Sequence, residues 1–440
     1  MKEKIRRDAH KDIDHIFKEL LPAQGLPERP EQTALSHRML DVMLNGGIAL
    51  CDAGTGISKT YTYLTAGIIF QRIHFMEGKL LKPLLISTSS IALQKAVRDE
   101  YLPFLSAVLM ADGMITEPIQ SVIRKGKAYY VCADIPFSDF GWLLIAPDRV
   151  LDIVQKQIAN HLSVSTHRRL EKLSSKVKLF CEGNANMLFY TAEDEDGGTV
   201  LCAAVLDLTA QLQGTLWNNS QSIVLASGTL AAGGGFQHYK EAVGLIKNSR
   251  VTESISPSPF DYQRNCLLYL PQCPPEQKVN IYYDKLTEEI FLLLKAVCGY
   301  ALVLFTSYSA ISAVKARLAQ MELPWPVFTL GRTSLHTMEQ FKASPGSVLL
   351  AAGAIWEGFD FPGDCVSLLV ILRLPFARPN ALKEKEHENF QDLHAFIRAI
   401  AVPEMQIKLK QGFGRAIRTE TDTCVIAILD ERAVKRKALF

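Results

Sequence analysis

The sequence predicts an α/β fold with a parallel sheet in each half of the chain. Short apolar runs that suit buried strands alternate with segments of helical periodicity between residues 48 and 429. Such alternation is typical of parallel strands joined by crossover helices. At 440 residues the chain is too long for one hydrophobic core. We therefore expect two or three domains.

Composition and charge narrow the class of protein. The chain is 48% hydrophobic and 21% charged, as expected of a folded soluble protein. A net charge of +2 means that any nucleic-acid contact must come from local patches. Nine cysteines without paired CxxC spacing argue against a zinc ribbon and favour a reducing compartment, so we expect a cytoplasmic protein. The N-terminus lacks the apolar core of a signal peptide, and charges interrupt the apolar runs, so we expect no membrane segment.

The first predicted strand, Ile48–Ala53, leads into a glycine-rich turn and then a helix. Backbone N–H groups in such a turn can cradle phosphates, with Lys59 on the outer phosphates and Thr60 on Mg²⁺. Two positions depart from the general pattern. Ala53 replaces its first glycine, and Ser58 replaces the glycine before the lysine, where a Cβ crowds the backbone against the phosphates. An ordinary strand-to-helix turn rich in small residues remains the alternative.

Two flanking stretches are candidates for contacts with the nucleotide and with nucleic acid. Arg29 and Gln32 open a predicted helix and either read an adenine edge or form a solvated helix start. Leu84–Ser90 predicts a buried strand, and Ile91–Tyr101 predicts the helix after it. Functional groups gather at the carboxyl ends of parallel strands, so Thr88 and Gln94 are candidate contacts to a nucleic-acid backbone. A helix N-cap explains the hydroxyl residues equally well.

The span 105–200 is the least informative. Basic and aromatic residues mix over Arg124–Tyr130, which is typical of single-strand binding surfaces but also of a solvated face. Leu143–Asp148 predicts a strand and its exit. Glu193–Gly198 predicts an acidic hairpin turn between strands rather than a metal site. Gly233–Gly235 predicts either a hinge between the domains or a plain surface turn.

Five further strands are predicted after residue 220; the first two end in hydroxyl residues, and the third leads to Gly353. They cover Ser222–Leu230, Tyr300–Phe305, Val348–Ala352, Val366–Leu372 and Cys424–Leu429. Ser307 and Tyr308 stand at one of these strand ends and are candidate nucleic-acid contacts.

The motifs, taken in order, resemble those of superfamily 2 helicases of the XPD/DinG group. They are Arg29-Pro30-Glu31-Gln32, the glycine-rich turn, Ser227-Gly228-Thr229-Leu230, Trp356-Glu357-Gly358-Phe359-Asp360 and Gln411-Gly412-Phe413-Gly414-Arg415-Ala416-Ile417-Arg418. Ser258-Pro259-Phe260 and Leu374-Pro375-Phe376 also resemble that group. The resemblance implies two RecA-like domains, 1–235 and 236–440, the first with a reduced insertion at about 105–185. It also implies ATP in the cleft between them and five-prime to three-prime translocation on single-stranded DNA.

The resemblance also assigns roles to residues. Arg29 and Gln32 would contact adenine; Gly54, Thr55, Gly56, Ser58, Lys59 and Thr60 would hold the phosphates and Mg²⁺. In this family Ala53 is no departure, whereas Ser58 remains one. Ser227 and Thr229 would couple nucleotide state to DNA grip, and Glu357 and Asp360 would order the nucleotide side of the second domain. Gln411, Arg415 and Arg418 would approach the γ-phosphate, where arginine stabilises the charge of the transferring group.

Three departures from the family leave the activity open. The sequence contains no Asp-Glu-Ala-His, and Asp148 is a poor substitute. Only Cys132 and Cys181 fall between 101 and 200, so we expect no four-cysteine iron–sulfur cluster there. That fits the CRISPR-associated DinG branch, whose partner is an RNA-guided complex. The span from Thr88 to Ser227 is short, through a reduced insertion or a segment missing from the sequence.

Three functions stay open. The first is an ATP-dependent DNA helicase or translocase, and the second is a catalytically weak DNA-binding clamp or scaffold. A P-loop ATPase unrelated to DNA is the third, which the order of the motifs disfavours.

Overall fold

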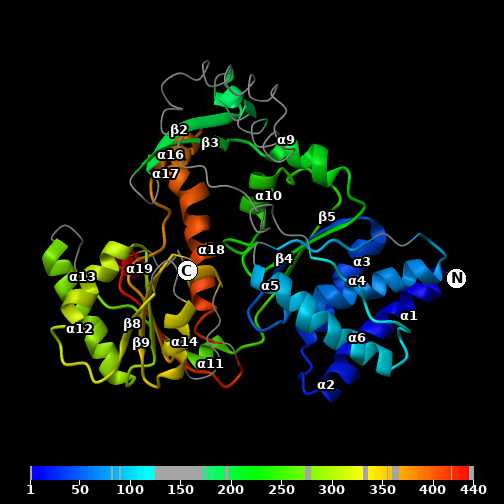
Figure 1. The fold of residues 1–440 in the computed structure, drawn as a ribbon, viewed down its shortest axis with the longest axis horizontal. Helices are drawn as coiled ribbons and strands as arrows, with labels where there is room; N and C mark the ends of the chain where they lie inside the picture. Colours follow the sequence, from blue (N-terminus) through cyan, green and yellow to red (C-terminus); the bar gives the residue numbers. More distant parts are fainter. Residues whose placement is uncertain are drawn as a thin grey trace, which may run out of the picture. The chain divides into compact units, whose positions relative to one another are not determined.

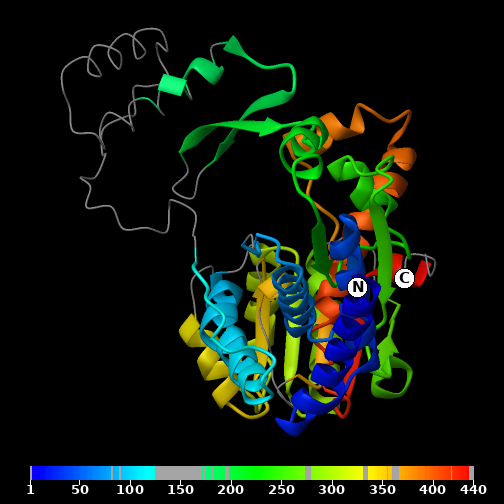
Figure 2. The same cartoon turned by 90° about the vertical axis from the view of Figure 1, so that its right-hand side faces the viewer.

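A computed structural model gives the fold of the chain (Figures 1 and 2). It describes residues 2–80, 83–88, 91–123, 171, 174–175, 177–180, 182–193, 198–272, 279–330, 335–353, 355–358, 366–417 and 419–435. The chain forms two compact units. The first unit is made of Met1–Ile123, Leu216–Arg378 and Leu393–Phe440, and the second of Arg124–Thr215 and Pro379–Asp392.

A three-stranded parallel sheet in the first unit has the order β4-β1-β5. Its strands are β1 (Ile48–Ala53), β4 (Ile223–Ser227) and β5 (Val251–Ser256). The central strand β1 is buried along its whole length, as its apolar run predicts. Around the sheet lie α1 (Lys2–His15), η1 (Ile16–Leu20), α2 (Leu21–Ala23), α3 (Pro30–Asn45), α4 (Lys59–Met76), α5 (Ile91–Ala96), η2 (Val97–Tyr101), α6 (Leu102–Ala111), η4 (Gln213–Trp217) and α10 (Gln237–Val243).

Local sequence explains the limits of α3. Pro30 stands at its first turn, where the missing N–H costs no hydrogen bond. Gly46 ends the helix at φ 71°, a left-handed conformation that glycine adopts without a Cβ clash. The helix therefore begins where the residue pattern predicts, and its C-terminus leads directly into β1.

A six-stranded parallel sheet in the same unit has the order β6-β11-β10-β7-β9-β8. Its strands are β6 (Cys266–Tyr269), β7 (Ala301–Phe305), β8 (Val327–Thr329), β9 (Val348–Ala352), β10 (Leu368–Ile371) and β11 (Cys424–Ile428). The helices are α11 (Tyr262–Asn265), α12 (Val279–Ala296), α13 (Tyr308–Leu318), α14 (Leu335–Ala343), α15 (Ile355–Gly358), α17 (Leu393–Phe396), η6 (Ile397–Ala401), α18 (Val402–Phe413) and α19 (Glu431–Lys435).

Helices cover both faces of the six-stranded sheet, with α12 and α13 on one face and α14 and α18 on the other (Figure 1). Alternate residues of each strand enter the two cores because successive side chains of a strand point to opposite faces. Along β7, for example, Val303 packs with the α12 and α13 side chains, and Leu304 with those of α14 and α18. This two-sided burial explains the continuous apolar runs in the sequence.

The second unit contains an antiparallel hairpin of β2 (Met187–Glu193) and β3 (Thr199–Val205). It also holds α9 (Thr209–Leu212) and α16 (Ala381–His387). Glu193 pairs with Thr199, so the predicted acidic turn does connect two strands. The turn residues 194–197, the basic and aromatic stretch 124–130 and the predicted strand 143–148 lie outside the described residues.

Two sequence predictions fail. Residues 83–88 form no strand, and Leu85 is 90% exposed, so the apolar run Leu84–Ser90 is not the buried strand that its composition predicts. The predicted boundary after residue 235 also differs from the sheet membership, because β5 follows Gly233–Gly235 and still pairs with β1. The passage from one sheet to the other is the connecting segment 257–265, between β5 and β6. The limits of the insertion stay a prediction.

Candidate nucleotide-binding site

The phosphate loop (Gly54–Thr60) joins the end of β1 to the start of α4. Gly56 has φ 89° and Ser58 has φ 57° with ψ 54°, so both lie in the left-handed region. The glycine that the general pattern places before the lysine suits this backbone, whereas Ser58 adopts it against the crowding of its Cβ. Lys59 begins α4, and its Nζ donates to the carbonyl oxygens of Ala53 at 3.1 Å and Gly54 at 3.4 Å.

The connecting segment packs directly onto the phosphate loop. A Cβ on Gly54 would lie 2.5 Å from Ser258 N, and one on Gly56 would lie 2.3 Å from the Phe260 ring. Ser258 Oγ donates to the Thr55 carbonyl oxygen at 2.7 Å. Both glycines are therefore required by packing, independently of any ligand.

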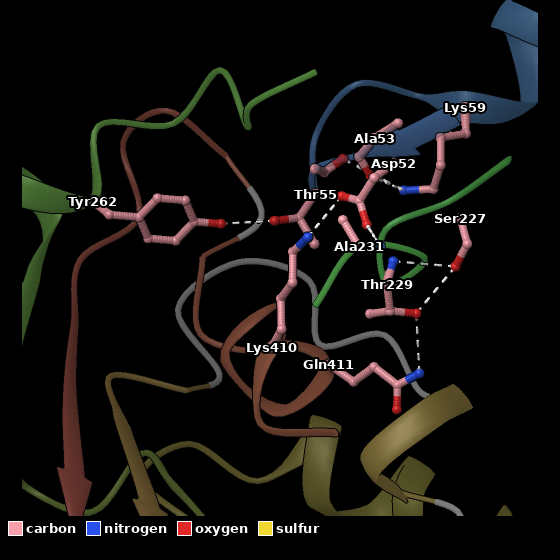
Figure 3. Close-up of polar contacts among 11 residues, drawn as sticks. Asp52, Ala53, Thr55, Lys59, Ser227, Thr229, Ala231, Tyr262, Lys410 and Gln411 are labelled. Carbon is pink, nitrogen blue, oxygen red and sulfur yellow. Dashed lines mark hydrogen bonds and ion pairs between the residues drawn. The ribbon is translucent and has the colours of Figure 1, made fainter. Parts of the chain in front are cut away.

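A further contact fixes the side chain of Thr55. Its Oγ1 lies 2.7 Å from the hydroxyl of Tyr262, the first residue of α11 (Figure 3). The loop is thus hydrogen-bonded through backbone and side chain to the segment that links the two sheets. A change at the loop has a direct path to the start of the six-stranded sheet.

Arg29 and Gln32 stand beside the loop, as the sequence predicts. Gln32 Nε2 donates to the Ser58 carbonyl oxygen at 3.1 Å. Arg29 Nη1 donates to Ser58 Oγ at 3.2 Å and to the Gly56 carbonyl oxygen. Their head groups line a small pocket with an apolar wall, which suits one edge of a heterocycle. The pocket is lined by Phe17, Leu21, Leu26, Pro27, Arg29, Gln32, Ser58 and Tyr61. Contact of Arg29 and Gln32 with adenine stays a prediction.

The end of β4 meets α18 next to the phosphate loop (Figure 3). Ser227 Oγ and Thr229 Oγ1 are 3.1 Å apart, and Gln411 Nε2 donates to Thr229 Oγ1 at 3.4 Å. A Cβ on Gly228 would lie 3.6 Å from Lys59 Nζ. The structure thus brings Lys59, Ser227, Thr229 and Gln411 together, although they come from both sheets.

Arg415 follows α18 and donates from Nη2 to the carbonyl oxygen of Trp356 at 3.3 Å. Trp356 is itself buried and donates from Nε1 to the Phe305 carbonyl oxygen at 3.0 Å. Arg415 therefore lies on the six-stranded side of the site. Arg418 and Asp360 lie outside the described residues, and for Glu357 only the backbone is described, within α15.

Four of the predicted nucleic-acid residues, Thr88, Gln94, Ser307 and Tyr308, lie on helices or loops away from the phosphate-loop contacts described above. Ser307 is the N-cap of α13, and its Oγ accepts a hydrogen bond from Ala310 N at 3.2 Å. Its neighbour Tyr308 is 39% exposed. Thr88 lies in the segment 83–88, which has no regular secondary structure, and Gln94 lies on α5. DNA contact by these four residues stays a prediction.

The residues of the loop fit ATP better than they fit a complete magnesium site. The left-handed turn, the helix start and Lys59 match a phosphate cradle. Thr60 is the residue that would hold Mg²⁺, and its side chain is hydrogen-bonded to Tyr63, whose phenol pKa is raised by burial and partly lowered by that bond. Within the described ranges, no group of three or more His, Cys, Asp or Glu side chains is arranged to hold a metal ion.

Sequence reasoning gave no role to Asp52, Lys410, Ser258 or Tyr262, all of which contact the site. Asp52 Oδ2 accepts from Ala231 N at 2.8 Å, and its Oδ1 lies 2.6 Å from Lys410 Nζ. A charged residue inside the apolar run of β1 was the available signal, because buried charges need partners. The lysine before Gln411 carried no comparable signal, since surface helices commonly carry lysines.

Comparison with known proteins supports the resemblance that the motifs carry. Residues 290–439 match the helicase C-terminal domain family. The chain is 29% identical over 254 residues to the ATP-dependent DNA helicase DinG of Photobacterium profundum, covering 56% of this chain and 36% of the relative. It is 32% identical over 276 residues to the ATP-dependent DNA helicase YoaA of Haemophilus influenzae, covering 62% and 42%. The matches thus span less than half of the length of these relatives.

Solved structures give the same answer for the fold. An apo structure of XPD aligns with a TM-score of 0.53 at 14% identity, covering 92% of this chain and 98% of that one. A structure of the XPD helicase aligns with a TM-score of 0.55 at 13% identity, covering 93% and 97%. The two parallel sheets and these neighbours confirm the predicted α/β fold class and are consistent with two RecA-like domains. Among the helices of the described residues, none is both long and apolar enough to cross a bilayer.

Proposed function

We propose that the chain is the motor of an ATP-dependent DNA helicase or translocase. One contact supports this proposal: Gln411, on α18, donates a hydrogen bond to Thr229. Helix α18 packs on the six-stranded sheet, whereas Thr229 follows β4 of the three-stranded sheet and lies beside the phosphate loop. A site assembled from two sheets can open and close with its ligand. The named activities of DinG and YoaA support DNA as the substrate.

Each residue has a part in this proposal. ATP supplies the phosphoanhydride bond whose cleavage drives the motor. Lys59 and the loop N–H groups hold the phosphates, Thr60 holds Mg²⁺, and Arg29 and Gln32 face the base. Gln411 and Arg415 reach the terminal phosphate from the other sheet, as arginines do in phosphoryl transfer. Ser227 and Thr229 carry the state of the site to the DNA, at Thr88, Gln94, Ser307 and Tyr308.

Steady-state ATP turnover with and without single-stranded DNA tests the proposal. We expect DNA to stimulate turnover and Lys59→Ala to abolish it. Forked duplexes with either a five-prime or a three-prime tail test direction, and we expect unwinding from the five-prime tail. An ATP turnover rate that is the same with and without single-stranded DNA would contradict the helicase proposal and favour an ATPase unrelated to DNA.

A narrower proposal concerns the partner. We propose that the chain lacks an iron–sulfur cluster and acts in the cytoplasm with a CRISPR RNA-guided complex that opens DNA. It rests on the cysteine count between 101 and 200. Visible absorbance with stoichiometric iron would contradict the first part. For the second part, we expect an RNA-guided complex on its target to stimulate turnover more than the same DNA alone.

The second candidate function is a DNA-binding clamp with weak or no ATP hydrolysis. It is favoured by the serine in the left-handed position before Lys59 and by the absence of Asp-Glu-Ala-His from the sequence. The two candidates differ in one measurement. A clamp binds single-stranded DNA with the same affinity in wild type and Lys59→Ala and shows no DNA-stimulated turnover in either.

A further inference from the structure

Asp52 is a buried carboxylate at the point where the two sheets meet. Its side chain is 1% exposed, although it lies one residue before the end of β1. Oδ2 accepts a hydrogen bond from the backbone N of Ala231 at 2.8 Å, and Oδ1 lies 2.6 Å from Lys410 Nζ (Figure 3). A buried charge is tolerated when it is paired and hydrogen-bonded, and both conditions are met here.

The three partners belong to three parts of the site. Asp52 stands two positions before the first glycine of the phosphate loop, and Ala231 stands two positions after Thr229. Lys410 directly precedes Gln411 on α18. The Asp52 carboxylate at the end of β1 therefore contacts both the segment after β4 and helix α18. Gln411 lies on α18, and Arg415 follows it.

The rest of α18 is anchored in the other sheet. Met405 and Leu409 are buried in the core that contains Trp356. A Cβ on Gly412 would lie 2.9 Å from the Trp356 ring, so the helix packs closely on that side. Lys410 reaches from this anchored helix across to the three-stranded sheet. If α18 moved away, Asp52 would stay buried without its cation, which is unfavourable.

We propose that the Asp52–Lys410 ion pair fixes the position of α18 relative to the phosphate loop. Both residues are then positioning residues for ATP hydrolysis. This inference rests on the proposed ATPase function. Neither side chain takes part in the chemistry. Their effect is to hold Gln411 and Arg415 where the terminal phosphate of bound ATP would lie, and small misplacements of such groups cost large factors in rate.

The test compares Lys410→Met, Lys410→Arg, Asp52→Asn and the double variant Lys410→Met/Asp52→Asn with wild type. The control is Lys435→Met, which removes an exposed lysine that pairs with Glu431 on α19. Turnover with saturating single-stranded DNA, KM for ATP and melting temperature are measured on the same preparations. Lys410 is 45% exposed, so its replacement by Met leaves no cavity in the core.

We expect Lys410→Met to lower kcat by about tenfold to a hundredfold while KM for ATP changes by less than about threefold. Lys410→Arg should recover most of the rate because it keeps the charge and the reach. The double variant should lose no more than the worse single variant, since both changes break one contact. Lys435→Met should match wild type.

Three outcomes would overturn the inference while leaving the proposed function in place. The first is a turnover rate of Lys410→Met within twofold of wild type. The second is a rate loss that is explained by a lower melting temperature and is not rescued by Lys410→Arg. The third is a rate loss in the double variant equal to the product of the two single losses. Wild-type protein without ATP turnover would instead overturn the proposed function, and this inference with it.

Discussion

Gly56 and Phe260 are distant in the chain and in direct contact in the fold: a Cβ on Gly56 would lie 2.3 Å from the Phe260 ring. Gly56 also has φ 89°, a backbone angle that residues with a side chain rarely adopt. The contact joins the phosphate loop to the connecting segment between the two sheets. The loop is therefore shaped by the protein's own packing as well as by the ligand we propose for it.

The first prediction concerns this contact. Gly56→Ala should lower the free energy of unfolding by about 2–4 kcal/mol, because it adds backbone strain and overpacks the Phe260 ring. Gly78→Ala is the matched control, since Gly78 has φ +68° and no atom within 4 Å of an added Cβ. It should show only the smaller cost of the left-handed backbone. Equal losses in urea unfolding would mean that the ring moves aside freely.

Ser58 gives the second prediction. Ser58→Gly should raise ATP affinity or turnover, because it removes a Cβ where backbone approaches phosphate and relieves the left-handed strain. The melting temperature should change little, since the variant also loses the hydrogen bond from Arg29. Ser58→Ala keeps the Cβ and loses the hydroxyl, so it should show no gain. Equal ATP kinetics for all three proteins would show that the loop accommodates serine.

The third prediction concerns Arg415. Arg415→Ala should lower turnover by on the order of a thousandfold and leave ATP affinity nearly unchanged, because an arginine finger acts mainly in the transition state. Single-stranded DNA binding without nucleotide should survive. Arg317→Ala, which removes an arginine paired with Asp284 on the same side of the site, should hydrolyse ATP normally.

If Arg415 has only a structural role, the variant melts at a lower temperature and each folded molecule turns over ATP at the normal rate. In the structure Arg415 donates to the Trp356 carbonyl oxygen, and Asp422 accepts from Thr419 N. Turnover, ATP affinity and melting temperature of one preparation separate the two roles.

The fourth prediction concerns acid stability. Burial raises the pKa of the Asp430 carboxyl, but hydrogen bonds from Arg432 and the Leu374 N–H outweigh it and hold the pKa below its usual 3.8. Its contribution to stability is therefore present above pH 3.8 and is lost as the pH falls through the folded-state pKa. Asp430→Asn should be less stable by about 1–3 kcal/mol at pH 7.

That difference should shrink in urea unfolding below about pH 3.8. Asp284→Asn is the control, because Asp284 is 56% exposed and a surface ion pair contributes little. A difference between Asp430→Asn and wild type that stays constant from pH 7 to pH 3 would contradict the assignment.

Local patterns predicted most of the strands. Val348–Ala352 forms the predicted strand without a change at either end, because both faces of the sheet are covered and every residue is apolar. The run Leu84–Ile86 is also apolar, yet residues 83–88 form no strand. Composition reports whether a segment can be buried in a sheet, whereas pairing depends on a neighbouring strand that periodicity does not identify.

The candidate site divides in the same way. The phosphate loop and Gln411 carry motifs, so their place could be predicted. Asp52–Lys410 and Thr55–Tyr262 join residues that are distant in the chain, and no local pattern indicates such pairs. The strain at Ser58 was expected from crowding of the phosphates, and the structure adds a cause in the left-handed backbone itself.

The packing of Gly54 and Gly56 against Ser258 and Phe260 has a consequence for how this loop evolves. If the chain uses ATP as we propose, a descendant that had stopped doing so would still need both glycines, because a side chain at either position collides with the connecting segment. Selection for folding alone would therefore preserve them. This packing does not constrain Lys59 and Thr60. Substitutions at these two positions would therefore mark the lineages that have lost the proposed ATPase activity.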